Sequence, residues 1–228
     1  SETDFVANTD EFKAFVNQVA DTIIEKNPAD VEALKATVVS GGTATVDEAL
    51  QELFLKIREN LQIRRFVRLE GTLMPYIHGG GKIGVMVRVE SSDGASEAAL
   101  TVAKDCALQI AAMNPAYLNR EAVPASVLEE EKTIVLSQMA EDPKMAAKPE
   151  QVRAKIAEGK VGKYFSENCL LEQTFVKDGS MTVQQYVDSA AKAAGTSIKV
   201  VEYVRFERGE GIEKKADNFA EEIASMIK

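Results

Sequence analysis

The sequence has 228 residues, of which 45% are hydrophobic and 28% are charged. At roughly 150 residues per domain this length corresponds to one or two domains, and the composition excludes long disordered and fibrous chains. There are 27 lysines and arginines against 36 aspartates and glutamates, and the net charge of −9 argues against direct binding of nucleic acid.

Cysteine and histidine are scarce. Cys106 and Cys169 have no neighbouring metal-ligand partner, and His78 is the only histidine. This excludes zinc fingers and multi-histidine sites and argues against a disulfide framework, so we expect neither a metal nor a cofactor. No apolar run approaches the ~18 residues of a membrane helix, and the first residues are acidic where a signal peptide would be basic. We therefore expect a cytoplasmic protein without membrane contact.

Helical periodicity dominates the first part of the chain. Apolar residues recur every three to four positions, polar capping residues precede the runs, and Pro28 and Gly41-Gly42 interrupt them. These patterns predict helices over residues 9–26, 30–37 and 45–57.

The period then changes to that of a half-buried strand at residues 83–89, where apolar residues alternate with other residues. Residues 66–70 are the predicted partner strand. The glycine-rich stretch 75–82 between them is predicted to be the connection of a β-hairpin with a mobile tip. Small and apolar residues over 95–113 predict a buried helix that packs closely on the sheet.

The pattern of residues 118–170 predicts two antiparallel helices, each with a thin apolar stripe. The second helix begins at Pro149. A protruding helical hairpin follows from this pattern, and a second copy of the chain could cover its stripe. The remainder predicts a turn at 177–180, a helix at 182–194, a strand at 198–206 and a C-terminal amphipathic helix. Arg65–Glu70 and Glu202–Glu207 are similar in sequence, which is weak support for two related β/α halves.

The chemical motifs point away from an enzyme. His78 followed by three glycines matches the oxyanion loop of lipase-like hydrolases, but the chain has no Gly-x-Ser-x-Gly elbow and no second histidine. Gly81-Lys82 evokes a phosphate-binding loop, yet Ile83 stands where Ser or Thr is required. A glycine-rich hairpin connection explains the stretch better. Cys106 is interpreted as a buried apolar residue.

Thr3-Asp4-Phe5-Val6 places an aromatic beside an acid ahead of the first helix. Phe5 could pack on that helix, as apolar residues before a cap often do, or it could be an exposed anchor for a partner's pocket. Spacing alone favours packing.

Several segments, in order and over nearly the whole chain, resemble bacterial elongation factor Ts. They are Glu2–Ala7, Ile63-Arg64-Arg65, Tyr76–Val85, Ala111–Pro115, Leu171–Val176 and Glu207–Lys214. The resemblance implies a guanine-nucleotide exchange factor that promotes GDP release from elongation factor Tu during translation, without covalent catalysis.

The resemblance also implies which residues contact the partner. In that family the Thr-Asp-Phe-Val segment pushes its aromatic between helices of the GTPase domain, near its magnesium and phosphate site. This reverses the preference for a packed Phe5 and assigns partner binding to Thr3, Asp4, Phe5 and Val6. The family's other contacts correspond to His78 and Gly79 and, in the Lys56–Asn60 segment, to Ile57. Many members have Gly where this chain has Arg58.

The family begins with a small three-helix domain related to ubiquitin-associated domains, which this sequence lacks, so we expect a fragment of the longer protein. The predicted fold is α+β, with two similar β/α subdomains containing small antiparallel sheets, an inserted coiled-coil hairpin and a C-terminal helix. The expected segments are an N-terminal core (1–117), the hairpin (118–170), a C-terminal core (171–207) and a helical module (208–228). A coiled-coil dimerisation or scaffold module, and a small-molecule enzyme with a pocket at His78, remain as alternatives.

Overall fold

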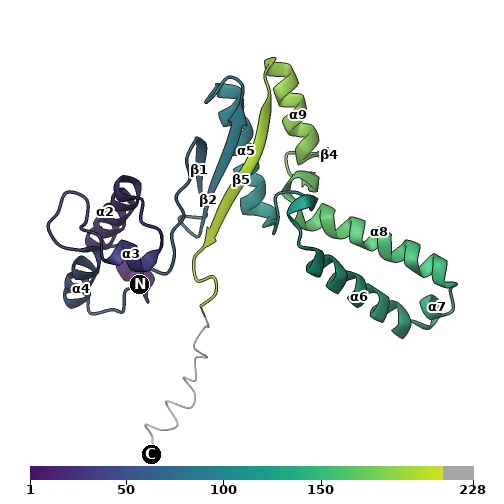
Figure 1. The fold of residues 1–228 in the computed structure, drawn as a ribbon, viewed down its shortest axis with the longest axis horizontal. Helices are drawn as coiled ribbons and strands as arrows, with labels where there is room; N and C mark the ends of the chain where they lie inside the picture. Colours follow the sequence, from purple (N-terminus) through teal and green to yellow (C-terminus); the bar gives the residue numbers. More distant parts are fainter. Residues whose placement is uncertain (213–228) are drawn as a thin grey trace, which may run out of the picture. The chain divides into compact units, whose positions relative to one another are not determined.

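The computed structural model describes residues 1–212 and has an α+β fold, in which helices accompany small antiparallel sheets (Figure 1). The chain divides into two compact units, the first formed by Ser1–Glu70 and the second beginning at Gly71. Each unit contains its own hydrophobic core. Within residues 1–212 no helix combines the length and apolar character that crossing a bilayer requires.

The first unit is helical. It comprises α1 (Asp4–Ala7), α2 (Asp10–Lys26), α3 (Val31–Lys35) and α4 (Val46–Ile57). The residue before each helix accepts a hydrogen bond from a first-turn N–H through its side chain, the usual N-cap arrangement; these residues are Thr3, Thr9, Asp30 and Thr45. The three helices predicted from periodicity are confirmed, close to their predicted boundaries.

The core of the first unit lies between α2, α3 and α4. Phe15, Val19 and Ile23 form the buried stripe of α2, as their spacing predicts. They belong to one cluster with Leu34 and Val46, whose side chains have no exposed surface. Burying these side chains, rather than helix propensity, supplies most of the stability of such short helices.

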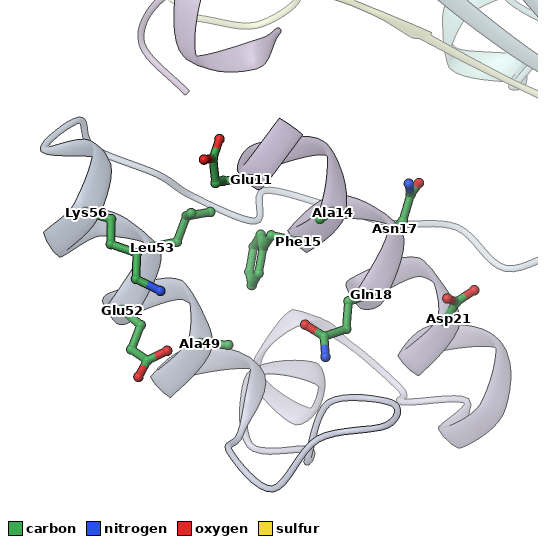
Figure 2. Close-up of a pocket in the computed structure, with 10 residues that line it drawn as sticks. All are labelled: Glu11, Ala14, Phe15, Asn17, Gln18, Asp21, Ala49, Glu52, Leu53 and Lys56. Atoms are coloured by element: carbon green, nitrogen blue, oxygen red, sulfur yellow. The ribbon is translucent and has the colours of Figure 1, made fainter. Parts of the chain in front are cut away.

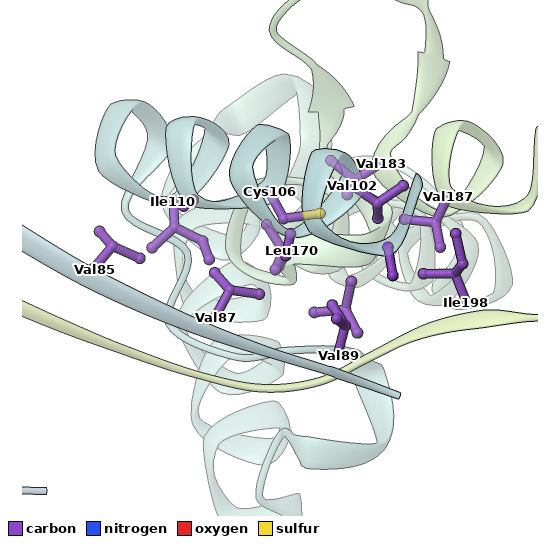
Figure 3. Packing of buried hydrophobic residues seen from close by; sticks show 14 of the residues in the cluster. Val85, Val87, Val89, Val102, Cys106, Ile110, Leu170, Val183, Val187 and Ile198 are labelled. Carbon is purple, nitrogen blue, oxygen red and sulfur yellow. The ribbon is translucent and has the colours of Figure 1, made fainter. Parts of the chain in front are cut away.

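The second unit is built on a three-stranded antiparallel sheet. Its strands are β1 (Thr72–His78), β2 (Ile83–Ser91) and β5 (Ile198–Glu207), in the order β1-β2-β5. On the central strand Val85, Val87 and Val89 point into the core, which confirms the predicted alternation. The helices α5 (Glu97–Met113) and α9 (Val183–Ala194) contribute the opposite wall of this core (Figure 3).

The remaining elements of the second unit run from α5 to α9. They are η1 (Arg120–Ala122), α6 (Ala125–Glu141), α7 (Pro143–Ala146), α8 (Glu150–Asn168), η2 (Leu170–Glu172), β3 (Thr174–Phe175) and β4 (Asp178–Thr182). The long helices α6 and α8 pack against each other, with α7 at the far end (Figure 1). A small cluster of Val135, Met139 and Ala157 is buried between them.

A buried polar pair ties the chain after α8 back to α5. Gln109, which is fully buried on α5, donates to Gln173 Oε1 and to the carbonyl of Thr174, each over 3.1 Å, and accepts from the Val176 N–H over 2.8 Å. Gln173 in turn donates to the carbonyl of Glu167. All these bonds satisfy polar groups that would be costly to bury alone.

The predicted partner strand at residues 66–70 is wrong. Those residues form no strand, and Phe66 packs against the core of the first unit. Gly71, at φ +116°, separates them from β1, which begins at Thr72 and occupies half of the predicted connection. Pro75 obscured this strand, but β1 is an edge strand, where a missing N–H is tolerated. The hairpin itself is present, with its loop at residues 79–82.

The similar segments Arg65–Glu70 and Glu202–Glu207 do not have similar structures, because only the second forms a strand. That strand, β5, pairs with β2, so the principal sheet combines segments assigned to both predicted cores. Along the sequence, the division between the compact units falls between Glu70 and Gly71, whereas the predicted first core extends to residue 117. The predicted C-terminal helix over about 217–227 lies outside the described residues.

Candidate partner-binding site

The Thr3–Val6 segment presents an exposed aromatic. Thr3 is the N-cap of the single-turn helix α1 (Asp4–Ala7), and its Oγ1 accepts the Val6 N–H over 3.3 Å. Val6 is buried in the core of the first unit, whereas Phe5 is 82% exposed. Phe5 therefore does not pack on the following helix, and Val6 is the apolar residue that anchors this turn.

Glu59 fastens the beginning of the segment. Its Oε2 accepts the N–H groups of Glu2 over 3.2 Å and of Thr3 over 3.1 Å, and its Oε1 accepts the Thr3 hydroxyl. Chiefly because of the hydrogen bond from the Thr3 side chain, the pKa of Glu59 lies below its ordinary value. Since the pKa is lowered in the folded state, the stabilising contribution of this carboxylate is fully present above its ordinary pKa and is lost as the pH falls from there through the lowered pKa.

The Lys56–Asn60 segment is thereby brought to the Thr3–Val6 turn. Arg58 ends α4 in the left-handed conformation (φ 61°, ψ 29°), and its N–H donates to the Phe54 carbonyl over 2.7 Å. Ile57 is half-buried and packs against the core of the first unit. Glu59 was not singled out from the sequence, since a bond between residues 56 positions apart leaves no local pattern.

His78 and Gly79 lie at the tip of the β1–β2 hairpin, in the second unit. His78 is exposed at the end of β1, and its Nδ1 lies 2.9 Å from the Tyr76 hydroxyl. Gly79, Gly80 and Gly81 all have positive φ, which other residues adopt with strain. The glycines therefore serve the tight connection, in agreement with the interpretation of this stretch as a hairpin loop.

A groove of about 480 Å³ lies between α2 and α4 (Figure 2). Phe15 and Leu53 provide apolar surface within it, and Glu11, Glu52 and Lys56 place charges around it. The groove is lined by residues of the first unit alone and does not include His78. It therefore gives no support to an enzyme with a pocket around that histidine.

The cysteines are unsuited to nucleophilic chemistry. Both are fully buried, and burial raises the pKa of Cys106 to about 12 and that of Cys169 to about 11. Thiols with such pKa values stay protonated at neutral pH, whereas the thiolate is the nucleophile. Cys106 is the buried apolar residue that the sequence predicts. Residues 1–212 contain no cluster of three or more His, Cys, Asp or Glu side chains arranged to hold a metal ion.

Comparison with known proteins identifies the family. The family described as Elongation factor TS matches residues 2–210. Elongation factor Ts of Syntrophotalea carbinolica is 44% identical over 231 residues, which cover 100% of this chain and 75% of the relative. Elongation factor Ts of Trichlorobacter lovleyi is 46% identical over 232 residues, with 99% and 73% covered. That of Clostridium kluyveri is 44% identical over 230 residues, with 99% and 74% covered. These matches span nearly the whole sequence, and the chain belongs to the elongation factor Ts family.

Proposed function

We propose that this chain is a guanine-nucleotide exchange factor that promotes GDP release from elongation factor Tu in translation elongation. Membership of the elongation factor Ts family supports the general activity. The specific mechanism rests on one observation: the Phe5 side chain is 82% exposed, although the backbone is anchored on both sides of it. The protein acts in the cytoplasm and forms no covalent intermediate.

In this mechanism Phe5 is a wedge. A large apolar side chain held in water gains free energy when a partner buries it, and aromatic anchors of this kind dominate many interfaces. Thr3, Asp4 and Val6 shape the turn, and Phe5 enters between helices of the GTPase near its magnesium and phosphate site. His78 and Gly79 make a second contact from the hairpin tip, and the segment around Ile57 makes a third.

Exchange follows from thermodynamic linkage. If the factor binds nucleotide-free elongation factor Tu more tightly than the GDP complex, GDP must bind the factor complex more weakly by the same ratio. Each tenfold change in that ratio corresponds to about 1.4 kcal/mol. Displacing groups around the magnesium ion weakens the hold on the GDP phosphates, and GTP then binds the emptied site by mass action.

The test is stopped-flow release of fluorescent GDP from elongation factor Tu, with the chain in excess. We expect the chain to accelerate release and Phe5→Ala to reduce that acceleration about tenfold or more, as for an interface hot spot. Ile24→Ala is the matched control, because Ile24 is also a large exposed apolar residue of the first unit. Unchanged GDP release by a folded Phe5→Ala variant contradicts the wedge, and no acceleration by the parent chain contradicts the exchange activity.

A second role is proposed for the α6–α8 hairpin. Ile134, Leu136 and Val152 are each more than 40% exposed, although the hairpin buries only a small cluster of its own. One surface of a second copy would cover Ile134 of α6 together with Val152 of α8, whereas Leu136, two positions from Ile134, lies on a different face of α6. We therefore propose that the hairpin acts as a coiled coil that forms a homodimer, alongside the exchange activity.

A further inference from the structure

Both oxygens of the Glu59 carboxylate are bound to residues 56 and 57 positions earlier in the chain. We propose that Glu59 is a positioning residue for exchange, which holds Thr3 so that Phe5 is presented in one orientation before the partner is met. This inference rests on the proposed function of Phe5. In this role Glu59 makes no contact with the nucleotide. It acts on the orientation of Phe5 through Thr3.

The bonds form a continuous path to the aromatic residue. Glu59 accepts the Thr3 N–H and the Thr3 hydroxyl, and the oxygen of that hydroxyl accepts the Val6 N–H. One side chain thus fixes both the backbone before Phe5 and the amide after it. The lowered pKa of Glu59 agrees with a carboxylate whose charged form accepts these hydrogen bonds.

The turn needs such a tether because it cannot hold its own shape. A helix of four residues is far shorter than the length at which isolated helices become stable. Phe5 contributes little to the packing, since most of its surface is exposed. Val6 anchors the segment on the C-terminal side of Phe5, and Glu59 anchors it on the N-terminal side.

Loss of the tether has a characteristic kinetic effect. If Phe5 occupies its binding-competent orientation for a smaller fraction of the time, the apparent affinity falls by that fraction. The complex formed is nevertheless the same, so the maximal rate of GDP release is retained. A positioning role therefore raises the concentration that gives half-maximal acceleration and leaves the maximal rate unchanged.

The variants are chosen to separate the bonds. Glu59→Ala removes all acceptors, and Glu59→Gln keeps an acceptor oxygen for the two backbone N–H groups. Thr3→Val, at nearly constant shape, removes the hydroxyl and with it both the bond to Glu59 and the N-cap bond from the Val6 N–H. We expect Glu59→Ala to raise the half-maximal concentration about tenfold and Thr3→Val to raise it less. Glu59→Gln should keep the half-maximal concentration close to that of the parent chain. Glu52→Ala, within α4 and seven residues before Glu59, is the control; within residues 1–212 no hydrogen bond links it to the turn.

A second readout needs no partner. The chain contains no tryptophan, so Phe5→Trp introduces a single tryptophan, whose fluorescence reports on the exposed position. We expect its anisotropy to fall when Glu59→Ala is added and to stay unchanged with Glu52→Ala. Thermal unfolding of each variant verifies that the first unit remains folded; Thr3→Val supplies the same comparison if Glu59→Ala unfolds.

The double variant Phe5→Ala with Glu59→Ala separates this inference from the proposed function. If Glu59 acts through Phe5, adding Glu59→Ala to Phe5→Ala changes GDP release no further. An equal additional loss in that background overturns the positioning role, as does an unchanged half-maximal concentration for folded Glu59→Ala. If Phe5→Ala alone has no effect on release, the wedge fails, whatever the anisotropy shows about the tether.

Discussion

At the scale of single residues, the candidate site contains residues that hold the backbone in place and one residue, Phe5, whose side chain faces outward. Val6 is buried and Phe5 is exposed, although the two are adjacent and similarly apolar. Sequence spacing cannot distinguish them, since the direction of each side chain depends on the turn set by Thr3 and by Glu59. The aromatic could be recognised from its motif, but the carboxylate that anchors it could not.

Arg58 shows how a residue choice can cost stability. It adopts left-handed angles at the C-terminus of α4, a position that glycine occupies in many helices. A side chain with a Cβ is strained there, whereas glycine is not. The strain is offset by the rest of the unit, which requires the chain to turn back after α4 so that Leu61 enters the core.

We expect Arg58→Gly to raise the free energy of unfolding of the first unit by about 0.5 to 1 kcal/mol, because relief of strain exceeds the added flexibility of the unfolded chain. Glu52→Gly is the matched comparison, since it lies within right-handed α4 and should lower stability by about 1 kcal/mol. Chemical denaturation of both variants measures the difference. A destabilised Arg58→Gly variant would show that the arginine side chain makes contacts worth more than the strain.

At the scale of elements, the prediction from sequence was accurate for helices and weaker for strands. Each predicted helix in the first unit has a polar cap and buries at least one apolar residue in the core, so local pattern and tertiary packing agree. β1 was displaced in the prediction because Pro75 and the following glycines are typical of a connection. Its edge position, which permits the proline, is a property of the assembled sheet and is not visible locally.

The hairpin gives the element-scale prediction. If Ile134 and Val152 are covered in a homodimer, then Ile134→Glu or Val152→Glu places a carboxylate in an apolar interface and opposes association. We expect sedimentation velocity to show a concentration-dependent dimer for the parent chain and a monomer for either variant. Gln151→Glu adds the same charge next to Val152 and should leave the dimer intact. A parent chain that stays monomeric at every concentration contradicts the proposal.

At the scale of the whole molecule, the main cores of the two compact units, as described within residues 1–212, differ in construction. The first is enclosed by helices, and the second by a sheet covered with α5 and α9. The second joins residues far apart in sequence, since β2 pairs with β5 and Gln109 bonds to Gln173. The proposed contacts also fall in both units, with Phe5 in the first and His78 in the second. The resemblance to the family assigned both proposed contacts from the sequence, whereas the pairing of β5 with β2 required the structure.

Because the two cores are separate, we expect a substitution in one core to reduce protection against amide hydrogen exchange in that core's unit and not in the other. Leu34→Ala removes a fully buried side chain from the first core and should cost about 2 to 5 kcal/mol. A unit of this size has little stability to spare, so its amides should exchange faster while those of β2 and α5 stay protected. Val87→Ala, in the second core, should give the reverse pattern, and Leu55→Ala, at a position that is 72% exposed, should change neither. Equal loss of protection in both units for Leu34→Ala would show that the two cores unfold as one cooperative structure.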